Sequence, residues 1–143
     1  MKRTITFILI LLFSTTLVAC NSNTPLKGEE IKNAFVGNWK VIEEISKDGE
    51  TKKTGNLKVI YAVTPTEYKY YLGDAMSMKK RVVYTWGDGN SINTQIFVTS
   101  ASMGEVSGGK ENIKIEIKVG KLYMKTGDGK TTVMEKYIED IPK

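Results

Sequence analysis

The side chains that carry out most protein chemistry are scarce in this chain of 143 residues. It contains no histidine and a single cysteine, Cys20. Histidine is the commonest general base and pH-sensitive group, and Ser-His-Asp and Cys-His catalysis both require it. The usual zinc sites also draw on histidine and cysteine. Only chemistry by carboxylates, lysine or tyrosine remains, so we expect neither an enzyme nor a bound cofactor or metal.

The acidic residues offer no catalytic pair and no calcium site. A glycosidase needs two carboxylates that face each other across a cleft, whereas the neighbours Glu43 and Glu44 would point to opposite faces of a strand. Asp-Gly pairs at Asp48, Asp88 and Asp128 recur at intervals of 40 residues. Because Ca²⁺ takes six to eight oxygen ligands and each pair offers few, we interpret them as hairpin turns.

Cys20 follows a segment with the layout of an export signal. Lys2 and Arg3 give a positive start, residues 5–13 are almost wholly apolar, and the small residue Ala19 precedes the cysteine. This order predicts a cleaved signal peptide over residues 1–19. A membrane span is the weaker alternative, because a helix needs about 20 apolar residues to cross a bilayer. A secretory signal without lipid would leave an unpaired cysteine.

The Leu17–Cys20 sequence (LVAC) resembles the lipobox of bacterial lipoproteins. The resemblance implies two or three acyl chains on Cys20, and more than one chain is needed for stable anchoring. Asn21 is not the aspartate that retains lipoproteins at the inner membrane, which favours the outer membrane, facing the periplasm, in a Gram-negative host. Residues 20–26 would form the lipidated tether.

Composition favours one domain over residues 27–143 with no nucleic-acid partner. The chain has 21 basic and 16 acidic residues, for a formal net charge of +5. No basic block is longer than Lys79-Lys80-Arg81, and nucleic-acid binding usually requires a denser patch.

The hydrophobic pattern predicts one short helix and then strands. Ile31 and Phe35 share a face of a helix over residues 27–36. Alternating apolar residues then predict eight strands, with polar loops at 73–79 and 100–110; the strands are expected at residues 38–46, 55–63, 67–72, 80–86, 91–99, 111–119, 122–126 and 130–139.

These consecutive strands, joined by tight turns, predict an all-β fold. An eight-stranded antiparallel up-and-down barrel would leave no exposed sheet edge. A two-sheet sandwich is the alternative.

Large side chains on the apolar faces are the candidate ligand-binding residues. An eight-stranded barrel has room for its own side chains or for one small ligand. A filled core and a ligand pocket therefore both remain open; the candidates are Tyr61, Tyr70, Tyr84, Trp86 and Ile96.

The segment around Gly37 and Trp39 resembles the start of lipocalin and lipocalin-like domains. There a Gly-x-Trp begins the first strand after a short helix that plugs the barrel. The resemblance implies a basic residue from the last strand over that tryptophan, and Lys136 is the candidate. The Thr-Asp-Tyr motif of lipocalin transporters is absent, so the similarity is to short bacterial lipocalin-like lipoproteins.

Two functions follow as leading hypotheses, and a third, an enzyme working through a carboxylate or a tyrosine, has no constellation of residues behind it. The first is a membrane-anchored barrel in the cell envelope that binds a small apolar or amphipathic molecule. The second is a lipoprotein that binds an envelope protein, as a hydrolase inhibitor or accessory subunit, through the loops at 73–79 and 100–110. Met76 and Met78 would make the first of these loops adaptable.

Overall fold

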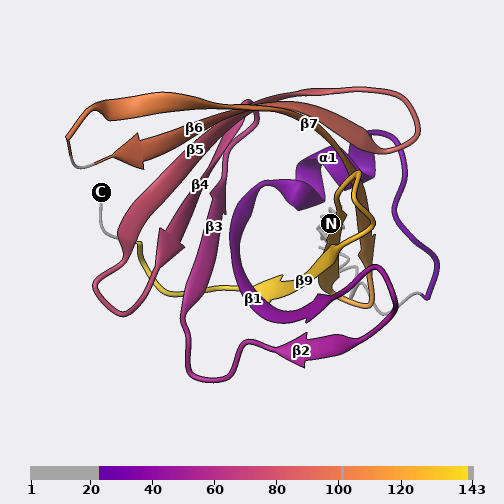
Figure 1. Ribbon diagram of the computed structural model, residues 1–143. Helices are drawn as coiled ribbons and strands as arrows, with labels where there is room; N and C mark the ends of the chain where they lie inside the picture. Colours follow the sequence, from indigo (N-terminus) through magenta and orange to yellow (C-terminus); the bar gives the residue numbers. More distant parts are fainter. Residues whose placement is uncertain (1–22, 101, 142–143) are drawn as a thin grey trace, which may run out of the picture.

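The computed structural model describes residues 23–100 and 102–141. Within them the chain forms one short helix followed by nine strands (Figure 1). In chain order these are α1 (Glu29–Phe35), β1 (Gly37–Ile45), β2 (Thr51–Lys53), β3 (Val59–Val63), β4 (Glu67–Leu72), β5 (Ser77–Trp86), β6 (Ser91–Ser100), β7 (Gly104–Lys118), β8 (Lys121–Lys125) and β9 (Thr131–Lys136).

The strands close into an eight-stranded antiparallel barrel. From β3 to β9 each strand pairs with the next along the chain, and β1 pairs with both β3 and β9. β2 stands outside this circuit, because it pairs only with the last three residues of β1. The predicted barrel is confirmed. The sandwich alternative is wrong, because one continuous ring of pairing joins β1 and β3 through β9.

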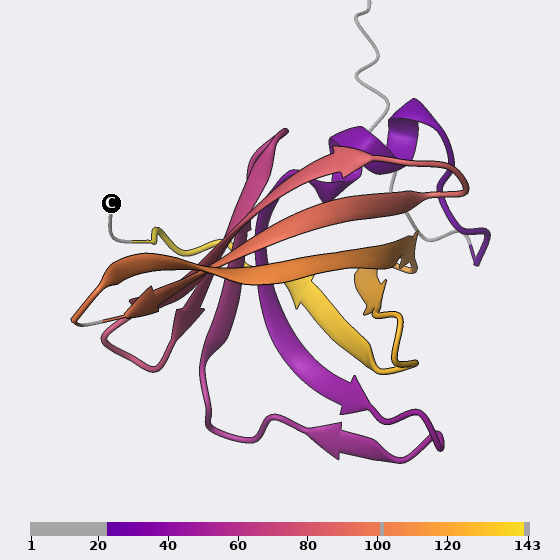
Figure 2. The same cartoon turned by 45° about the horizontal axis from the view of Figure 1, so that its top comes forward.

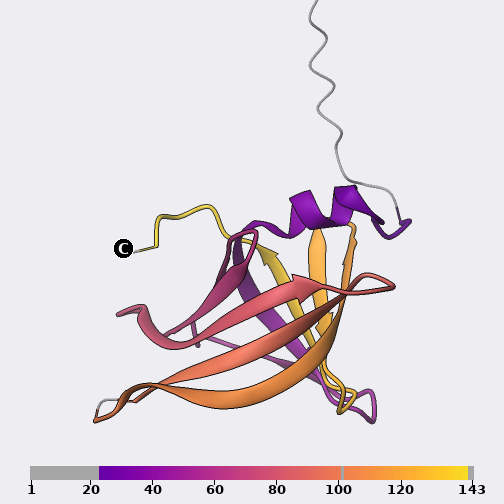
Figure 3. The same ribbon diagram turned by 90° about the horizontal axis from the view of Figure 1, so that it is seen from above.

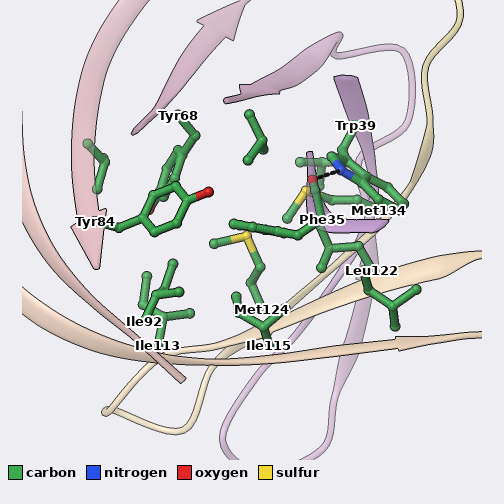
Figure 4. Close-up of a cluster of buried hydrophobic side chains, with 14 of the residues drawn as sticks. Phe35, Trp39, Tyr68, Tyr84, Ile92, Ile113, Ile115, Leu122, Met124 and Met134 are labelled. Carbon is green, nitrogen blue, oxygen red and sulfur yellow. Dashed lines mark hydrogen bonds between the residues drawn. The ribbon is translucent and has the colours of Figure 1, made fainter. Parts of the chain in front are cut away.

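Apolar side chains that alternate with polar ones along the strands fill the barrel. Ile113, Ile115 and Ile117 of β7 are all less than 5% exposed, while Lys114 between them is exposed. Successive strand residues point to opposite faces, so each strand contributes one apolar row to the interior. Figure 4 shows these rows meeting the aromatic side chains of other strands in one core.

Helix α1 plugs one end of the barrel (Figure 3). Ile31 and Phe35 lie four residues apart on its buried face and are 1% and 0% exposed. The Phe35 ring meets Tyr84 and Trp86 in edge contacts, with ring centroids 5.5 and 5.7 Å apart. Such pairs are favourable beyond the apolar area that they bury. The plug is therefore part of the core.

Trp39 and Lys136 join the helix to the first and last strands. Trp39 Nε1 donates to the Phe35 carbonyl at 2.8 Å. Lys136 Nζ lies 3.9 Å from the centroid of the Trp39 ring and donates to the carbonyls of Ala34 and Val36 at 3.1 and 3.0 Å. The lysine lies where the resemblance predicts it, and it also caps the carbonyl end of α1, where cations are favoured.

Several predicted boundaries are wrong. The helix is shorter than residues 27–36. The strand predicted over 55–63 begins only at Val59, because the Leu57 amide bonds back to the Thr54 carbonyl in a turn, which leaves Leu57 53% exposed. β2 was not predicted, since its three residues are all exposed. β5 already begins at Ser77, and β9 ends at Lys136 rather than at residue 139.

The loop predicted over residues 100–110 is the largest error. β6 runs to Ser100 and β7 starts at Gly104, so most of this segment is strand. Val98 pairs with Val106 and Ile96 with Gly109, and the register shifts between these pairs at Gly108. A bulge of this kind bends a strand. The hairpin extends past the other strands (Figure 2).

The contacts of Lys136 predict a measurable share of the stability. Lys136→Met should lower the free energy of unfolding by about 2 kcal/mol, because it removes a cation–π contact and two charge-assisted hydrogen bonds. Chemical denaturation with tryptophan fluorescence measures this. Lys125→Met is the control, since Lys125 is exposed on β8 and should change stability little. Equal stability of the two variants would contradict a closing role for Lys136.

Candidate functional site

The two ends of the barrel differ in construction. The turns after β3, β5 and β7 lie at the end that α1 covers, where Asn90 bonds to Leu26 just before the helix. The turns after β1, β4, β6 and β8 lie at the other end, which no helix covers in the described part of the chain. We call this second end the open end of the barrel.

A pocket of about 250 Å³ lies at the open end. It lies where β1 passes from its pairing with β3 to its pairing with β2. Its floor is apolar and aromatic and its rim is polar; the lining residues are Val41, Glu44, Lys52, Lys53, Thr54, Leu57, Val59, Tyr61, Tyr70 and Thr132.

The volume limits what can enter. A cavity of about 150 Å³ accepts benzene, and pockets for drug-sized ligands span roughly 300–1,000 Å³. At about 250 Å³ the pocket lies between these limits. A small amphipathic molecule, such as one ring with a short chain, matches this space.

A bulge in β1 turns a carboxylate into the pocket. Val41 pairs with Met134 but Glu43 pairs with Val133, so the register shifts at Ile42. Glu44 therefore takes the inward position that strict alternation would give to Glu43. The Glu44 carboxylate lies 3.4 Å from Lys130 Nζ, an ion pair at the rim.

Tyrosine hydroxyls that bond to nothing in the described part of the chain lie near the pocket floor. Tyr61 packs against Tyr68 and Tyr70 with ring centroids 5.4 and 5.3 Å apart. In the same part of the chain no fully buried side-chain nitrogen or oxygen lacks a partner. The hydroxyls of Tyr61 and Tyr68 therefore reach accessible space, because a dry, unbonded hydroxyl would be costly.

Burial also controls the ionisation of the interior phenols. Loss of hydration raises the pKa of Tyr84 to about 12 and raises the pKa values of Tyr61 and Tyr68 further. For Tyr61 the charges of Glu44 and Glu111 add to this effect. The phenols are therefore neutral hydrogen-bonding groups at any physiological pH.

Lys80 supplies a cation beside the pocket. Its Nζ lies 5.1 Å from the centroid of the Tyr70 ring, and Tyr70 lines the pocket. Among the described residues Lys80 has no carboxylate within ion-pair distance. Partial burial lowers the pKa of Lys80, while Glu111 acts in the opposite direction. An anionic group near Tyr70 would compensate this desolvation.

The structure divides the predicted ligand-binding residues. Tyr61 and Tyr70 line the pocket. Tyr84 donates to the Thr64 carbonyl at 2.6 Å and lies with Trp86 against the helix plug. Ile96 packs on the edge of the core. The plugged half of the barrel is filled with side chains, and open space remains at the other end.

Sequence reasoning missed the polar rim. Glu44 depends on the bulge. Lys52 and Lys53 belong to a strand with no buried residue, and Thr54 follows it. Leu57 was expected inside the sheet, and its 53% exposure at the pocket is the better signal of function. Alternation of apolar and polar residues does not identify these residues, because β2 pairs beside the end of β1 and lies outside the ring of the barrel.

The Asp-Gly pair at Asp128 forms a turn, as predicted. The Asp128 carboxylate accepts hydrogen bonds from Thr126 Oγ1 and from the Lys130 amide. Across residues 23–100 and 102–141, no cluster of three or more His, Cys, Asp or Glu is placed to hold a metal ion. In the same residues no helix has the length and apolar character needed to span a bilayer. Cys20 and the signal segment lie outside the described residues.

Comparison with solved structures identifies the architecture. A lipocalin-like protein from Bacteroides uniformis superposes with a TM-score of 0.54 at 16% identity, over 73% of this chain and 99% of that one. The fold is a lipocalin-like barrel. An uncharacterized protein from Bacteroides eggerthii matches with a TM-score of 0.53 at 20% identity, over 71% and 98% of the two chains.

These similarities concern the fold alone, because both identities are low. No family model matches the chain, and no curated protein sequence matches it. Any function of this lipocalin-like barrel must therefore be argued from its own residues.

The raised tyrosine pKa values predict a loss of stability in base. Unfolded tyrosine ionises near pH 10, whereas folded Tyr84 holds its proton to about pH 12. The free energy of unfolding should therefore fall as the pH rises from about 10 towards 12, because the unfolded chain releases protons first. Denaturation at several pH values measures the slope. Tyr84→Phe should make the slope shallower without abolishing it, because Tyr61 and Tyr68 still hold their protons in the folded state. An unchanged slope would contradict the assignment.

Proposed function

We propose that this protein binds a small amphipathic molecule at the open end of its barrel. The observation that carries the proposal is the pocket of about 250 Å³, with an apolar floor, unbonded tyrosine hydroxyls and a charged rim. Ligand sites usually combine apolar walls with a few placed polar groups. Neither catalysis nor a cofactor is part of the proposal.

The charges favour an anionic head on the ligand. The Glu44 carboxylate is already paired with Lys130, whereas Lys80 has no such partner among the described residues. An apolar body would contact Val41, Val59 and Tyr61, and a carboxylate or similar anion would lie towards Lys80. Charge-assisted hydrogen bonds of this kind are stronger than neutral ones.

Three probes of one shape test this preference: 4-phenylbutanoate, its methyl ester and 4-phenylbutylamine. We expect the anion to bind most tightly and the amine least. Lys80→Met should weaken the anion about tenfold and leave the ester unchanged, since only the anion uses the ammonium. Calorimetric titration measures all three.

Lys79→Met is the matched control, because Lys79 is exposed and does not line the pocket. Absence of binding by every probe, with no shift of pocket resonances in NMR spectra, would refute the binding function. Equal binding of anion and ester would refute only the preference for an anion.

We propose further that lipid on Cys20 anchors the domain in the bacterial cell envelope. In a Gram-negative host we place it at the outer membrane, facing the periplasm. The support is the Leu17–Cys20 sequence after a short apolar segment.

Cys20→Ser should abolish incorporation of labelled palmitate and release the protein from the membrane fraction of expressing cells. Ser22→Ala is the control and should retain both the label and membrane binding. Membrane retention of unlabelled Cys20→Ser protein would point to an uncleaved signal instead.

A second candidate function, binding of a protein partner, has one specific observation behind it. The hairpin of β6 and β7 exposes Val98, Met103 and Val106, which are 45%, 72% and 40% exposed. The loop at 73–79 was predicted to contribute to the same role. That prediction is wrong in part, because Met76 is buried at 9% exposure. Grouped apolar side chains on a soluble surface often mark an interaction site.

A further inference from the structure

One edge of β7 has no partner strand over most of its length in the described part of the chain. β7 pairs with β6 over residues 104–114 but with β8 only over residues 114–118. Residues 104–113 therefore have a strand on one side only. Ten residues at roughly 3.3 Å each give an open edge of about 30 Å. Figure 3 shows this part of β7 continuing past β8.

The usual protections of a sheet edge are only partly present here. Natural edges are covered, kept short, twisted away by a β-bulge, or blocked by proline or inward-pointing charge. This edge has the bulge at Gly108 and the half-buried carboxylate of Glu111, but it is long and has no covering strand in the described part of the chain. Residues 104–113 contain no proline, and residues 104–110 are all exposed. Gly104, Gly108 and Gly109 carry no side chain that would hinder an approaching strand. Alternate residues of an edge strand present their N–H and C=O groups away from the paired neighbour.

The hairpin is held in place rather than free. Arg81 of β5 makes two hydrogen bonds of 2.9 Å to the Glu105 carboxylate of β7 and reaches Glu67 at 3.3 Å. Its guanidinium also lies 4.7 Å from the centroid of the Phe97 ring on β6. These contacts join β4, β5, β6 and β7 across their outer face. A fixed edge loses less conformational entropy on binding.

A cationic groove of about 470 Å³ lies at the end of this edge. It separates Asn112 and Lys114 of β7 from the turn between β8 and β9, and Lys47 and Lys125 also line it. None of the three lysines forms an ion pair with a described residue. The one carboxylate of the groove, Asp128, accepts bonds within its own turn, which lowers its pKa.

We propose that the β7 edge binds an extended acidic segment of a partner protein as an added strand. The segment would pair with residues 104–113 in line with β8 and place acidic side chains in the groove beside Lys47, Lys114 and Lys125. Main-chain bonds supply affinity in this mode, and side-chain contacts supply selectivity. The inference rests on the second candidate function and is independent of the pocket.

Three nine-residue peptides with acetylated N-termini and amidated C-termini test whether binding occurs by strand addition. The first alternates valine with glutamate, the second alternates valine with lysine, and the third is the acidic peptide with alternate backbone nitrogens methylated. We expect only the first to bind and to slow hydrogen exchange of the amides in residues 104–113. Equal binding of the basic or the methylated peptide would overturn the proposal.

Charge reversal locates the contact. The double variant Lys114→Glu, Lys125→Glu should weaken the acidic peptide about tenfold, a factor consistent with two exposed charge contacts. Lys114 and Lys125 face each other across β7 and β8, so the variant exchanges one like-charged pair for another. Lys27→Glu, Lys79→Glu is the control, with the same change of charge at exposed residues outside both the pocket and the groove, and should bind as the unaltered protein does.

Two further results would overturn the assignment of this edge. One is a concentration-dependent dimer with protected amides in residues 104–113, because a second copy would then occupy the edge. The other is a protein partner retained equally by the protein and its Lys114→Glu, Lys125→Glu variant. That result would leave protein binding standing and place it elsewhere.

Discussion

The closed end of the barrel depends on one set of contacts around the Phe35 carbonyl. Trp39 donates to this carbonyl, and Lys136 lies over the tryptophan ring while it bonds the carbonyls on either side. These bonds satisfy the last carbonyls of a helix too short to be stable alone. They also join α1 to β1 and β9, the two strands that close the ring. The buried Phe35 ring then fills the interior at this end.

This arrangement explains why the open space lies where it does. The aromatic contacts continue from Phe35 through Tyr84 and Tyr68 to Tyr61, so the plugged half is packed with side chains. Beyond Tyr61 the strands diverge, because β1 exchanges its partner β3 for the isolated β2. Polar and charged residues occupy the inward positions there. A barrel of this size accommodates a ligand only where its own side chains end.

Sequence reasoning succeeded where one physical rule governed a residue. Alternation located the inward rows of β7, and spacing of four located Ile31 and Phe35 on the helix. It failed at the bulges, since Glu44 and Gly108 owe their positions to one extra residue in a strand. It failed also for residues 104–110, where glycine and serine conceal a strand that only its pairing with β6 defines. Both errors concern the open end, where local preference and tertiary structure disagree.

The chain enters the domain at the end opposite to both proposed sites. The Leu26 amide bonds to the Ile117 carbonyl beside the plug, close to the start of α1. A lipid on Cys20, only a few residues earlier, would therefore hold the closed end towards the membrane. The pocket and the β7 edge would then face away from the bilayer, where a soluble ligand or a partner segment can reach them. An anchor at the opposite end would bring both sites against the membrane, so the position of the plug helix makes anchoring compatible with either function.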